Sequence, residues 1–157
     1  MIRSLTAIIL VFLLTHIPVT ACAADETADS PINPDQITGI WLIEEDGETV
    51  EKIEIYKRDG LYFGTIIWIR PSDSTGDPAV DKKNKTKELR NRPLLGLEVM
   101  KGFAFDGKET WRDGKVYAHR KGKTVSPKLT LVDEDHLKIQ VKLLFVKKSF
   151  VWQRDSS

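Results

Sequence analysis

Cysteine and histidine, two residue types that often act in catalysis and metal binding, are scarce in this sequence. Its 157 residues contain one cysteine and three histidines. The cysteine, Cys22, lies next to an N-terminal apolar run, so the chain beyond it has no disulfide, no reactive thiolate and no cysteine-based metal site. A small domain without these constraints has to be stabilised by its hydrophobic core.

An excess of charge of one sign is also absent. The formal net charge is +1, and the chain beyond Arg3 has 23 basic and 23 acidic residues. Such a balance provides no bulk attraction to nucleic acid, and we expect no nucleic-acid partner. The hydrophobic share of 41% and the charged share of 30% are typical of a soluble globular protein and not of a disordered one.

The apolar run from Leu5 to Leu14 is too short to span a bilayer comfortably. It follows a short positive start and precedes small residues, a pattern that predicts an export signal over residues 1–23. The protein is therefore expected to be periplasmic or secreted. Ala21-Cys22-Ala23 fits the small-x-small rule of ordinary signal peptidase, which favours a soluble product.

The same region leaves a second interpretation open. Val19-Thr20-Ala21-Cys22 resembles a lipobox, in which Cys22 is lipid-modified and becomes the N-terminus. The protein would then be a lipoprotein, associated with a membrane through Cys22. Residues 24–36 are small and acidic and include two prolines, so they are predicted to form a flexible linker ahead of a single domain at 37–155.

Helical periodicity is not convincing anywhere after Ile40. Short β-branched runs alternate instead with turn dipeptides such as Asp46-Gly47 and Asp59-Gly60. One buried face per strand and short turns predict an all-β fold, a single antiparallel meander closed into a β-barrel of about eight to ten strands. The predicted strands lie at 40–45, 50–57, 61–69, 93–103 and 137–143, with shorter ones near 111, 116–117 and 124–131, and a long surface loop covers 71–90.

The two ends of the predicted domain carry a matching pair of residues. Gly39-Ile40-Trp41 resembles the start of barrels of the lipocalin kind, in which the tryptophan plugs one end and an arginine of the last strand crosses its ring. Arg154 is the candidate arginine, and stacking of Arg on Trp is favourable by roughly 0.5–2 kcal/mol. Gly39, Trp41 and Arg154 are therefore predicted to close the barrel. Pro127 predicts an edge or a bulge, because proline has no N–H to donate.

These segments, in their order, resemble the domain-of-unknown-function family 2147 of exported bacterial proteins. The resemblance implies an exported lipocalin-like barrel with a cavity for a small apolar or amphiphilic molecule, and it implies no catalytic residues. Where the family usually has a glycine-bearing segment before the closing tryptophan, this chain has Leu143 to Lys148. The resemblance rests on Gly39-x-Trp41, Leu61-x-x-Gly64-x-Ile66, Asp81-x-x-Asn84, Arg92-Pro93-Leu94-Leu95-Gly96, Gly102-Phe103, Trp111, Gly114-x-Val116-Tyr117, Gly122-Lys123-Thr124 and Trp152-x-Arg154.

The aromatic residues admit two interpretations. Ligand pockets are mostly apolar, with a few polar groups. The alternative is that the aromatics fill a compact core, which is their usual place in a small barrel. The candidates for a ligand pocket are Phe63, Trp68, Phe103, Trp111 and Tyr117.

Candidate catalytic and metal-binding groups are few. His119 and His136 have no second histidine or cysteine at ligand spacing, so we expect no metal site and no cofactor. No Gly-x-Ser-x-Gly motif is present, and no catalytic residue is assigned. The carboxylates Asp73, Asp77 and Asp81 lie in a lysine-rich stretch, which favours a solvated loop over a calcium site.

These observations favour an exported, non-enzymatic β-barrel that binds or carries a small hydrophobic or amphiphilic ligand. One alternative is an envelope interaction protein with a filled core, which acts through its loops or the basic face between Arg70 and Arg92. The other is a hydrolase-type enzyme that uses His119 or His136 with a carboxylate at the barrel mouth. That alternative requires the two groups to converge in a cleft.

Overall fold

The computed structural model describes residues 32–71, 76–143 and 145–157. The predicted export signal at 1–23, the lipidation candidate Cys22 and the linker up to residue 31 lie outside the described residues. Within the described ranges, no helix combines the length and the apolar character needed to cross a membrane.

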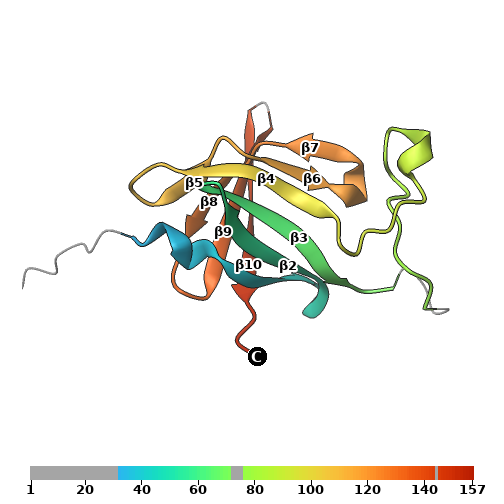
Figure 1. The fold of residues 1–157 in the computed structure, drawn as a ribbon, viewed down its shortest axis with the longest axis horizontal. Coiled ribbons are helices and arrows are strands. Elements are labelled where there is room, and N and C mark those ends of the chain that lie inside the picture. Colours follow the sequence, from blue (N-terminus) through green and yellow to red (C-terminus); the bar gives the residue numbers. More distant parts are fainter. Residues whose placement is uncertain (1–31, 72–75, 144) are drawn as a thin grey trace, which may run out of the picture. The chain divides into compact units, whose positions relative to one another are not determined.

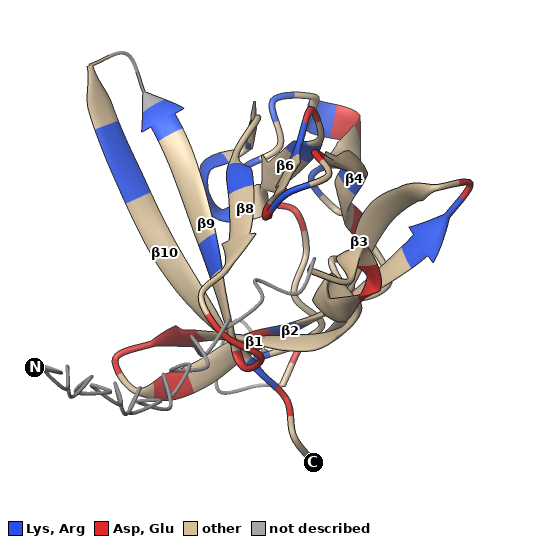
Figure 2. Ribbon diagram, turned by 90° about the vertical axis from the view of Figure 1, so that its left-hand side faces the viewer, with Lys and Arg blue, Asp and Glu red and all other residues tan. Residues whose placement is uncertain are grey.

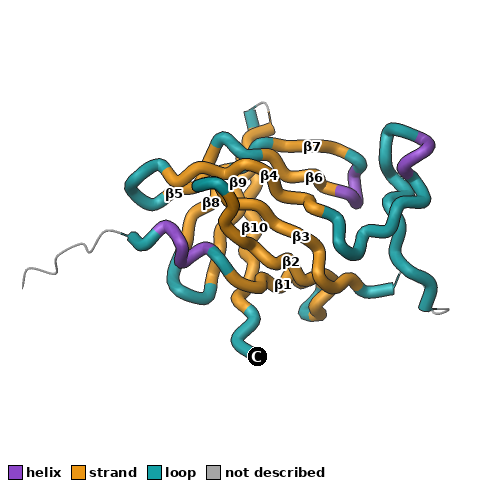
Figure 3. Tube along the Cα trace, in the orientation of Figure 1, coloured by secondary structure: helices purple, strands orange, loops and turns teal. Residues whose placement is uncertain are grey.

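The described chain is built from antiparallel strands that belong to one sheet (Figures 1 and 3). Three short 3₁₀ helices punctuate it: η1 (Pro34–Ile37), η2 (Lys87–Leu89) and η3 (His119–Lys121). The all-β fold predicted from the sequence is thus confirmed. The strands are β1 (Gly39–Glu45), β2 (Glu48–Arg58), β3 (Leu61–Ile69), β4 (Glu98–Phe105), β5 (Thr110–Arg112), β6 (Lys115–Ala118), β7 (Lys123–Val125), β8 (Lys128–Leu131), β9 (His136–Leu143) and β10 (Val146–Arg154).

The sheet closes on itself. Its order is β3-β2-β1-β10-β9-β8-β5-β4, and a further pairing between β3 and β4 completes a ring of eight strands. β6 and β7 extend the sheet from β4 as a hairpin outside this ring. Closure pairs strand edges that would otherwise be exposed. The predicted lipocalin-like barrel is confirmed in both strand direction and closure.

The chain order of the barrel is that of a meander in which one hairpin is interrupted. β5 and β6 pair with β4 at successive positions, and β7 and β8 return along them. The outgoing side breaks at Asp113-Gly114, where Asp113 has a φ of 67°, and the returning side breaks at Ser126-Pro127. Only the inner half of this hairpin, β8, pairs with β9. The other half of the hairpin, β6 and β7, is therefore free to diverge from the barrel wall.

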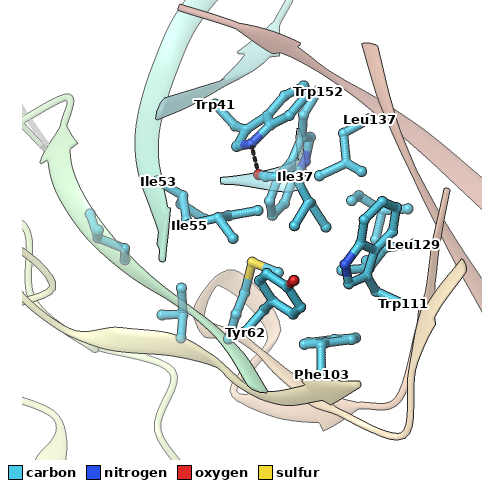
Figure 4. Packing of buried hydrophobic residues seen from close by; sticks show 14 of the residues in the cluster. Ile37, Trp41, Ile53, Ile55, Tyr62, Phe103, Trp111, Leu129, Leu137 and Trp152 are labelled. Carbon is cyan, nitrogen blue, oxygen red and sulfur yellow. Dashed lines mark hydrogen bonds between the residues drawn. The ribbon is translucent and has the colours of Figure 1, made fainter. Parts of the chain in front are cut away.

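One end of the barrel is densely packed (Figure 4). Trp41 and Trp111 are fully buried there, and the indole Nε1 of Trp41 donates a hydrogen bond to the carbonyl oxygen of Ile37 at 2.9 Å. We call this the closed end. Its other fully buried apolar side chains are Ile37, Ile55, Tyr62, Ile66, Met100, Phe103, Leu129 and Leu137.

The last residues of the predicted flexible linker belong to the fold. Pro34–Ile37 forms η1, and the side chain of Asn33 accepts a hydrogen bond from the amide of Asp35 at 3.0 Å. The Asp35 carboxylate in turn accepts hydrogen bonds from the Tyr62 hydroxyl and Lys57. Residues 34–36, the end of the predicted linker, are thus part of η1, and Ile37, which follows them, is fully buried in the core.

Candidate ligand-binding cavity

The barrel wall opens where two of its strands leave their neighbours. The β8–β9 ladder ends at the pair Lys128↔Gln140, and the residue preceding Lys128 is Pro127, which cannot donate to a ladder. On the other side, the β1–β10 ladder extends only over Trp41↔Arg154 and Leu42↔Gln153. β9 and β10 therefore continue together away from both β8 and β1. The prediction that Pro127 lies at an edge or a bulge matches this break.

A cavity of about 520 Å³ lies at this open end. Its walls come from the ends of β1 and β2, from β4, from the β6–η3–β7 hairpin and from β9 and β10. Most of its surface is apolar, and several of its side chains are valines. The apolar lining residues are Ile43, Ile53, Val99, Val116, Ala118, Val125, Pro127, Ile139, Val141, Phe150 and Trp152.

A histidine and a glutamate meet in the wall of the cavity. The His119 imidazole Nε2 lies 2.9 Å from the Glu51 carboxylate Oε2, and their side chains are only 11% and 5% exposed. Next to them, Arg120 forms an ion pair with Glu45. Both contacts link η3, at the tip of the β6–β7 hairpin, to β1 and β2. They hold this hairpin across the open end of the barrel.

The sequence analysis singled out His119 but missed Glu51. A signal was available, because Glu51 occupies the same face of β2 as Ile53 and Ile55, which point into the barrel. A charged residue at an inward position needs a partner. Sequence alone could not identify that partner, since His119 is distant in the chain and reaches Glu51 only when the barrel closes.

The mouth of the cavity carries unpaired positive charge. Lys121, Lys123 and Lys148 all line it and are exposed, and none of them forms an ion pair with another described residue. The two carboxylates in the lining, Glu45 and Glu51, are already engaged by Arg120 and His119. The mouth therefore combines an apolar interior with a basic rim.

A buried polar cluster holds the β6–β7 hairpin next to its tip. Asp81 is 1% exposed and accepts hydrogen bonds from the Tyr117 hydroxyl at 2.8 Å, from Asn84 at 2.7 Å and from Arg92 at 2.6 Å. The prediction of a solvated loop is therefore wrong for Asp81. Of the two other carboxylates, Asp77 is exposed, while Asp73 lies outside the described residues.

Burial and hydrogen bonding act on the Asp81 carboxyl in opposite directions. Burial raises its pKa, but the hydrogen bonds from Asn84, Arg92 and Tyr117 outweigh burial and leave the pKa below its ordinary value. Burial and the Asp81 charge raise the pKa of the Tyr117 hydroxyl. Asp81 is thus held as a carboxylate, and Tyr117 as a neutral hydrogen-bond donor. The cluster ties the loop before β4 to β6.

The turn after η3 touches the same loop through a glycine. Gly122 has a φ of 58°, and a Cβ placed on it would lie 1.8 Å from the carbonyl oxygen of Lys83. A side chain at this position would push the hairpin away from the loop. Gly122 thus allows the hairpin to sit where His119 reaches Glu51.

Most of the aromatic residues predicted to line a pocket lie elsewhere. Tyr117 lines the cavity, but Phe103 and Trp111 are fully buried in the closed end, as the alternative core interpretation expected. Phe63 stacks on Tyr56, with ring centroids 6.1 Å apart, and lies under Arg58. Trp68 is 40% exposed and is not part of the cavity lining.

The reason is the alternation of side chains along β3. Tyr62, Gly64 and Ile66 face the interior, so Phe63 faces outward. Aromatic character alone does not tell which face of a strand a residue occupies, nor which end of the barrel it reaches. Aliphatic residues, which the sequence analysis did not single out, form most of the cavity instead.

The closed end holds the three residues predicted to close the barrel. The Arg154 guanidinium lies 4.3 Å from the centre of the Trp41 ring. It also donates hydrogen bonds to the carbonyl oxygens of Thr38 and Gln36, at 2.9 and 2.6 Å. Gly39 has a φ of 124°, and its Cβ would lie 2.9 Å from this guanidinium, so glycine permits the close approach.

His136 lies away from the cavity, at the start of β9, where its Nδ1 contacts the Asp133 carboxylate at 2.7 Å. The hydrogen bond from His136 is the main reason that the pKa of Asp133 is lowered. Among the described residues there is no group of three or more histidine, cysteine, aspartate or glutamate side chains that could hold a metal ion.

Comparison with solved structures found a similar fold in a protein of the human pathogen Helicobacter pylori that is described as belonging to the lipocalin family. The TM-score is 0.64 at 23% sequence identity, and the match covers 76% of this chain and 83% of that protein. At this identity the likeness shows the fold. No match was found among curated proteins.

A comparison with protein families agrees with the motifs that span the barrel. The model of a family described as uncharacterized proteins conserved in bacteria matches residues 39–154, from the glycine before Trp41 to the arginine that covers it. This match covers the whole barrel and most of the chain. The chain therefore belongs to domain-of-unknown-function family 2147.

Proposed function

We propose that this protein binds a small amphiphilic molecule in the cavity at the open end of its barrel, without transforming it. The observation that carries the proposal is the contrast within one barrel between a densely packed end and a cavity of about 520 Å³. A barrel needed only as a rigid scaffold would gain stability from filling that space.

The volume and the lining of the cavity suit such a ligand. Sites for small molecules range from roughly 300 to 1,000 Å³, and they are mostly apolar with a few well-placed polar groups. Removing apolar ligand surface from water contributes about 25 cal/mol per Å² before the costs of association. The apolar part of the ligand would pack against the aliphatic walls, Val99 and Val141 among them.

Polar groups at the mouth would orient the ligand. The His119–Glu51 pair lies in the wall, and Lys121, Lys123 and Lys148 lie at the rim. A polar end that accepts hydrogen bonds is therefore favoured at the rim, with the apolar part directed inward. We infer an amphiphile in preference to a purely apolar molecule for this reason.

Native mass spectrometry of protein purified gently from its own host tests the proposal first. We expect a co-purifying small molecule that is lost on denaturation. The protein is then titrated with a fluorescent fatty-acid analogue, and two variants are compared with the unmodified protein. Val141→Trp fills the cavity from β9, whereas Val151→Trp is a control on the exposed part of β10. Val141→Trp should weaken binding at least about tenfold and Val151→Trp less than about twofold.

Two results would overturn the proposal. One is a clean ligand-free mass together with no binding of the analogue by the unmodified protein. The other is equal loss of binding in both tryptophan variants, which would place the analogue on the surface. Either result would favour the alternative of an interaction protein that acts through its loops.

A second candidate function rests on the His119–Glu51 pair. Such a pair, with the carboxylate orienting the imidazole, can move a proton on a bound molecule. The described lining residues include no serine, threonine or cysteine that could act as a nucleophile. This candidate requires the co-purifying molecule to change mass on incubation with the protein. The change should stop in His119→Gln, whereas unchanged conversion in that variant, or no conversion at all, would exclude it.

We also propose that the protein works in the cell envelope, as an exported soluble protein. The support is the export signal predicted at residues 1–23. Cell fractionation tests this location against the lipoprotein alternative. Cys22→Ala should leave both export and solubility unchanged if the product is soluble, and it should release the protein from the membrane if Cys22 carries a lipid.

A further inference from the structure

β9 and β10 continue beyond the barrel as a two-stranded arm (Figure 2). β9 pairs with β8 only over Leu137 to Gln140, and β10 pairs with β1 only at Gln153 and Arg154. Between these positions the two strands have only each other as partners among the described residues. We define the arm as the described residues of 141–151.

The arm exposes large apolar side chains. Phe145 is fully exposed, and Val146, Phe150 and Val151 are each more than half exposed. Exposed apolar residues scattered singly need no explanation, but four on one short hairpin form a concentration. Burying them is favourable, so the arm is suited to contact with an apolar phase.

The arm is also basic. The segment from His136 to Arg154 contains four lysines and one arginine and no acidic residue, in a chain with 23 acidic residues overall. Lys142 lies directly opposite Lys147 in the β9–β10 ladder, and no ion pair to another described residue involves either of them or Lys148. Like charges placed opposite each other destabilise a hairpin, so this arrangement does not serve the stability of the arm.

We propose that the arm docks on a membrane surface that contains anionic lipids. Phe145, Val146 and Val151 would enter the interface between head groups and acyl chains, while Lys142 and Lys147 would contact lipid phosphates. Apolar contact and attraction to anionic head groups act together in binding of this kind. The charge of the arm is what distinguishes this partner, because an acid-free apolar hairpin is complementary to an anionic surface.

This inference goes beyond the proposed function and does not depend on it. The two are connected, because Lys148 and Phe150 belong to the arm and also line the cavity. A docked arm would place the cavity mouth at the membrane surface. An amphiphile could then move between bilayer and cavity without crossing water.

Vesicle co-sedimentation tests the proposal on the full chain carrying Cys22→Ser, so that no lipid anchor contributes. Vesicles of phosphatidylcholine alone are compared with vesicles that also contain phosphatidylglycerol. We expect binding to the anionic vesicles only, weakened by added salt because salt screens the lysines. Equal binding to both kinds of vesicle, or binding to neither, would overturn the proposal.

Variants on the arm separate its two contributions. Phe145→Ser removes the apolar contact, and the double variant Lys142→Glu with Lys147→Glu reverses the charge. Each should weaken binding at least about tenfold. The matched control is Lys82→Glu with Lys83→Glu, on exposed lysines of the loop before β4, which should change binding less than about threefold.

Because the residues substituted on the arm and on the loop are exposed, these variants should unfold at the same temperature as the protein that carries Cys22→Ser alone. If the loop variant lost as much vesicle binding as the arm variants, binding would be due to general basicity and the proposal would be wrong. A dimer that forms through Phe145 in the absence of vesicle binding would equally overturn it and would assign the arm to a second copy of the chain.

Discussion

The two ends of this barrel are made largely from the same strands and are packed differently. At the closed end, Trp41, Trp111, Tyr62 and Phe103 are fully buried between the strands (Figure 4). At the open end, the same strands and their neighbours present mostly smaller branched residues, such as Val99 and Val141, and a cavity remains. Side-chain volume therefore contributes to which part of the barrel is core and which part is a cavity.

The two ends also differ in how they are held shut. At the closed end, one residue, Arg154, covers Trp41 and binds two backbone carbonyl groups of the chain before β1. At the open end, polar contacts between side chains, His119 with Glu51 and Arg120 with Glu45, hold a hairpin that lies outside the ring of eight strands. Because one end is held by packing and the other by polar contacts, we expect mutations at the two ends to change the free energy of unfolding by different amounts.

The largest expected effect is at the closed end. Trp111→Ala removes a fully buried side chain from the core and should lower the free energy of unfolding by about 3–5 kcal/mol. Val141→Ala, which only enlarges the existing cavity, should cost about 1 kcal/mol or less, because little new empty space is created. Urea unfolding of both variants gives the comparison. Similar losses in the two would mean that the open end is packed as tightly as the closed end.

An intermediate effect is expected where the hairpin meets the loop before β4. Gly122→Ala should destabilise by about 2–3 kcal/mol, because it combines a positive φ with a clash against the Lys83 carbonyl. Gly47→Ala is the matched control: its φ is 78°, but no atom lies within 4 Å of its Cβ, and the cost should be about 1 kcal/mol. Gly122→Ala should also weaken ligand binding. Equal unfolding energies for the two variants would show that the hairpin is not held by this contact.

The smallest of these effects concerns the buried carboxylate that anchors the hairpin. Asp81→Asn should lower stability by about 1–2 kcal/mol at neutral pH, because it removes a charge-assisted contact with Arg92. The fold lowers the pKa of Asp81, so its contribution is complete above the pKa of the unfolded state and is lost as pH falls through the pKa of the folded state.

The difference in unfolding energy between the parent protein and Asp81→Asn should therefore be constant from neutral pH down to about pH 5 and should shrink at more acidic pH. Thermal unfolding measured over this range checks the sign. A difference that grows on acidification would contradict the assigned direction of the shift.

Much of the fold was predictable because it depends on local pattern. β3 runs from Leu61 to Ile69, the residues that its β-branched and aromatic run indicates, and the turn before it follows from Asp59-Gly60. Period-two alternation and turn dipeptides are read along a few neighbouring residues. The pairing of Trp41 with Arg154 required the family resemblance in addition, since the two lie at opposite ends of the domain.

The candidate site was mostly not predictable, for two physical reasons. Phe103 and Trp111 are aromatic, but their strand positions send them into the closed end, away from the cavity. Asp81 lies in a lysine-rich stretch that predicts a solvated loop, yet it is buried. Arg92 and Tyr117 supply hydrogen-bond donors from farther along the chain, and Asn84 supplies one from the same loop. Both outcomes depend on contacts between residues that are distant in the sequence, and a local sequence pattern holds no information about such contacts.

By itself, the sequence determined that the chain is an all-β, cysteine-poor domain built from short strands, and it placed Gly39, Trp41 and Arg154 at the ends of the barrel segment. Only the tertiary structure decided which end of the barrel is filled, that Glu51 meets His119, and that β9 and β10 leave the wall beyond Pro127. Strand formation follows from neighbours in the chain, whereas a cavity is the space left between residues that closure of the barrel brings together.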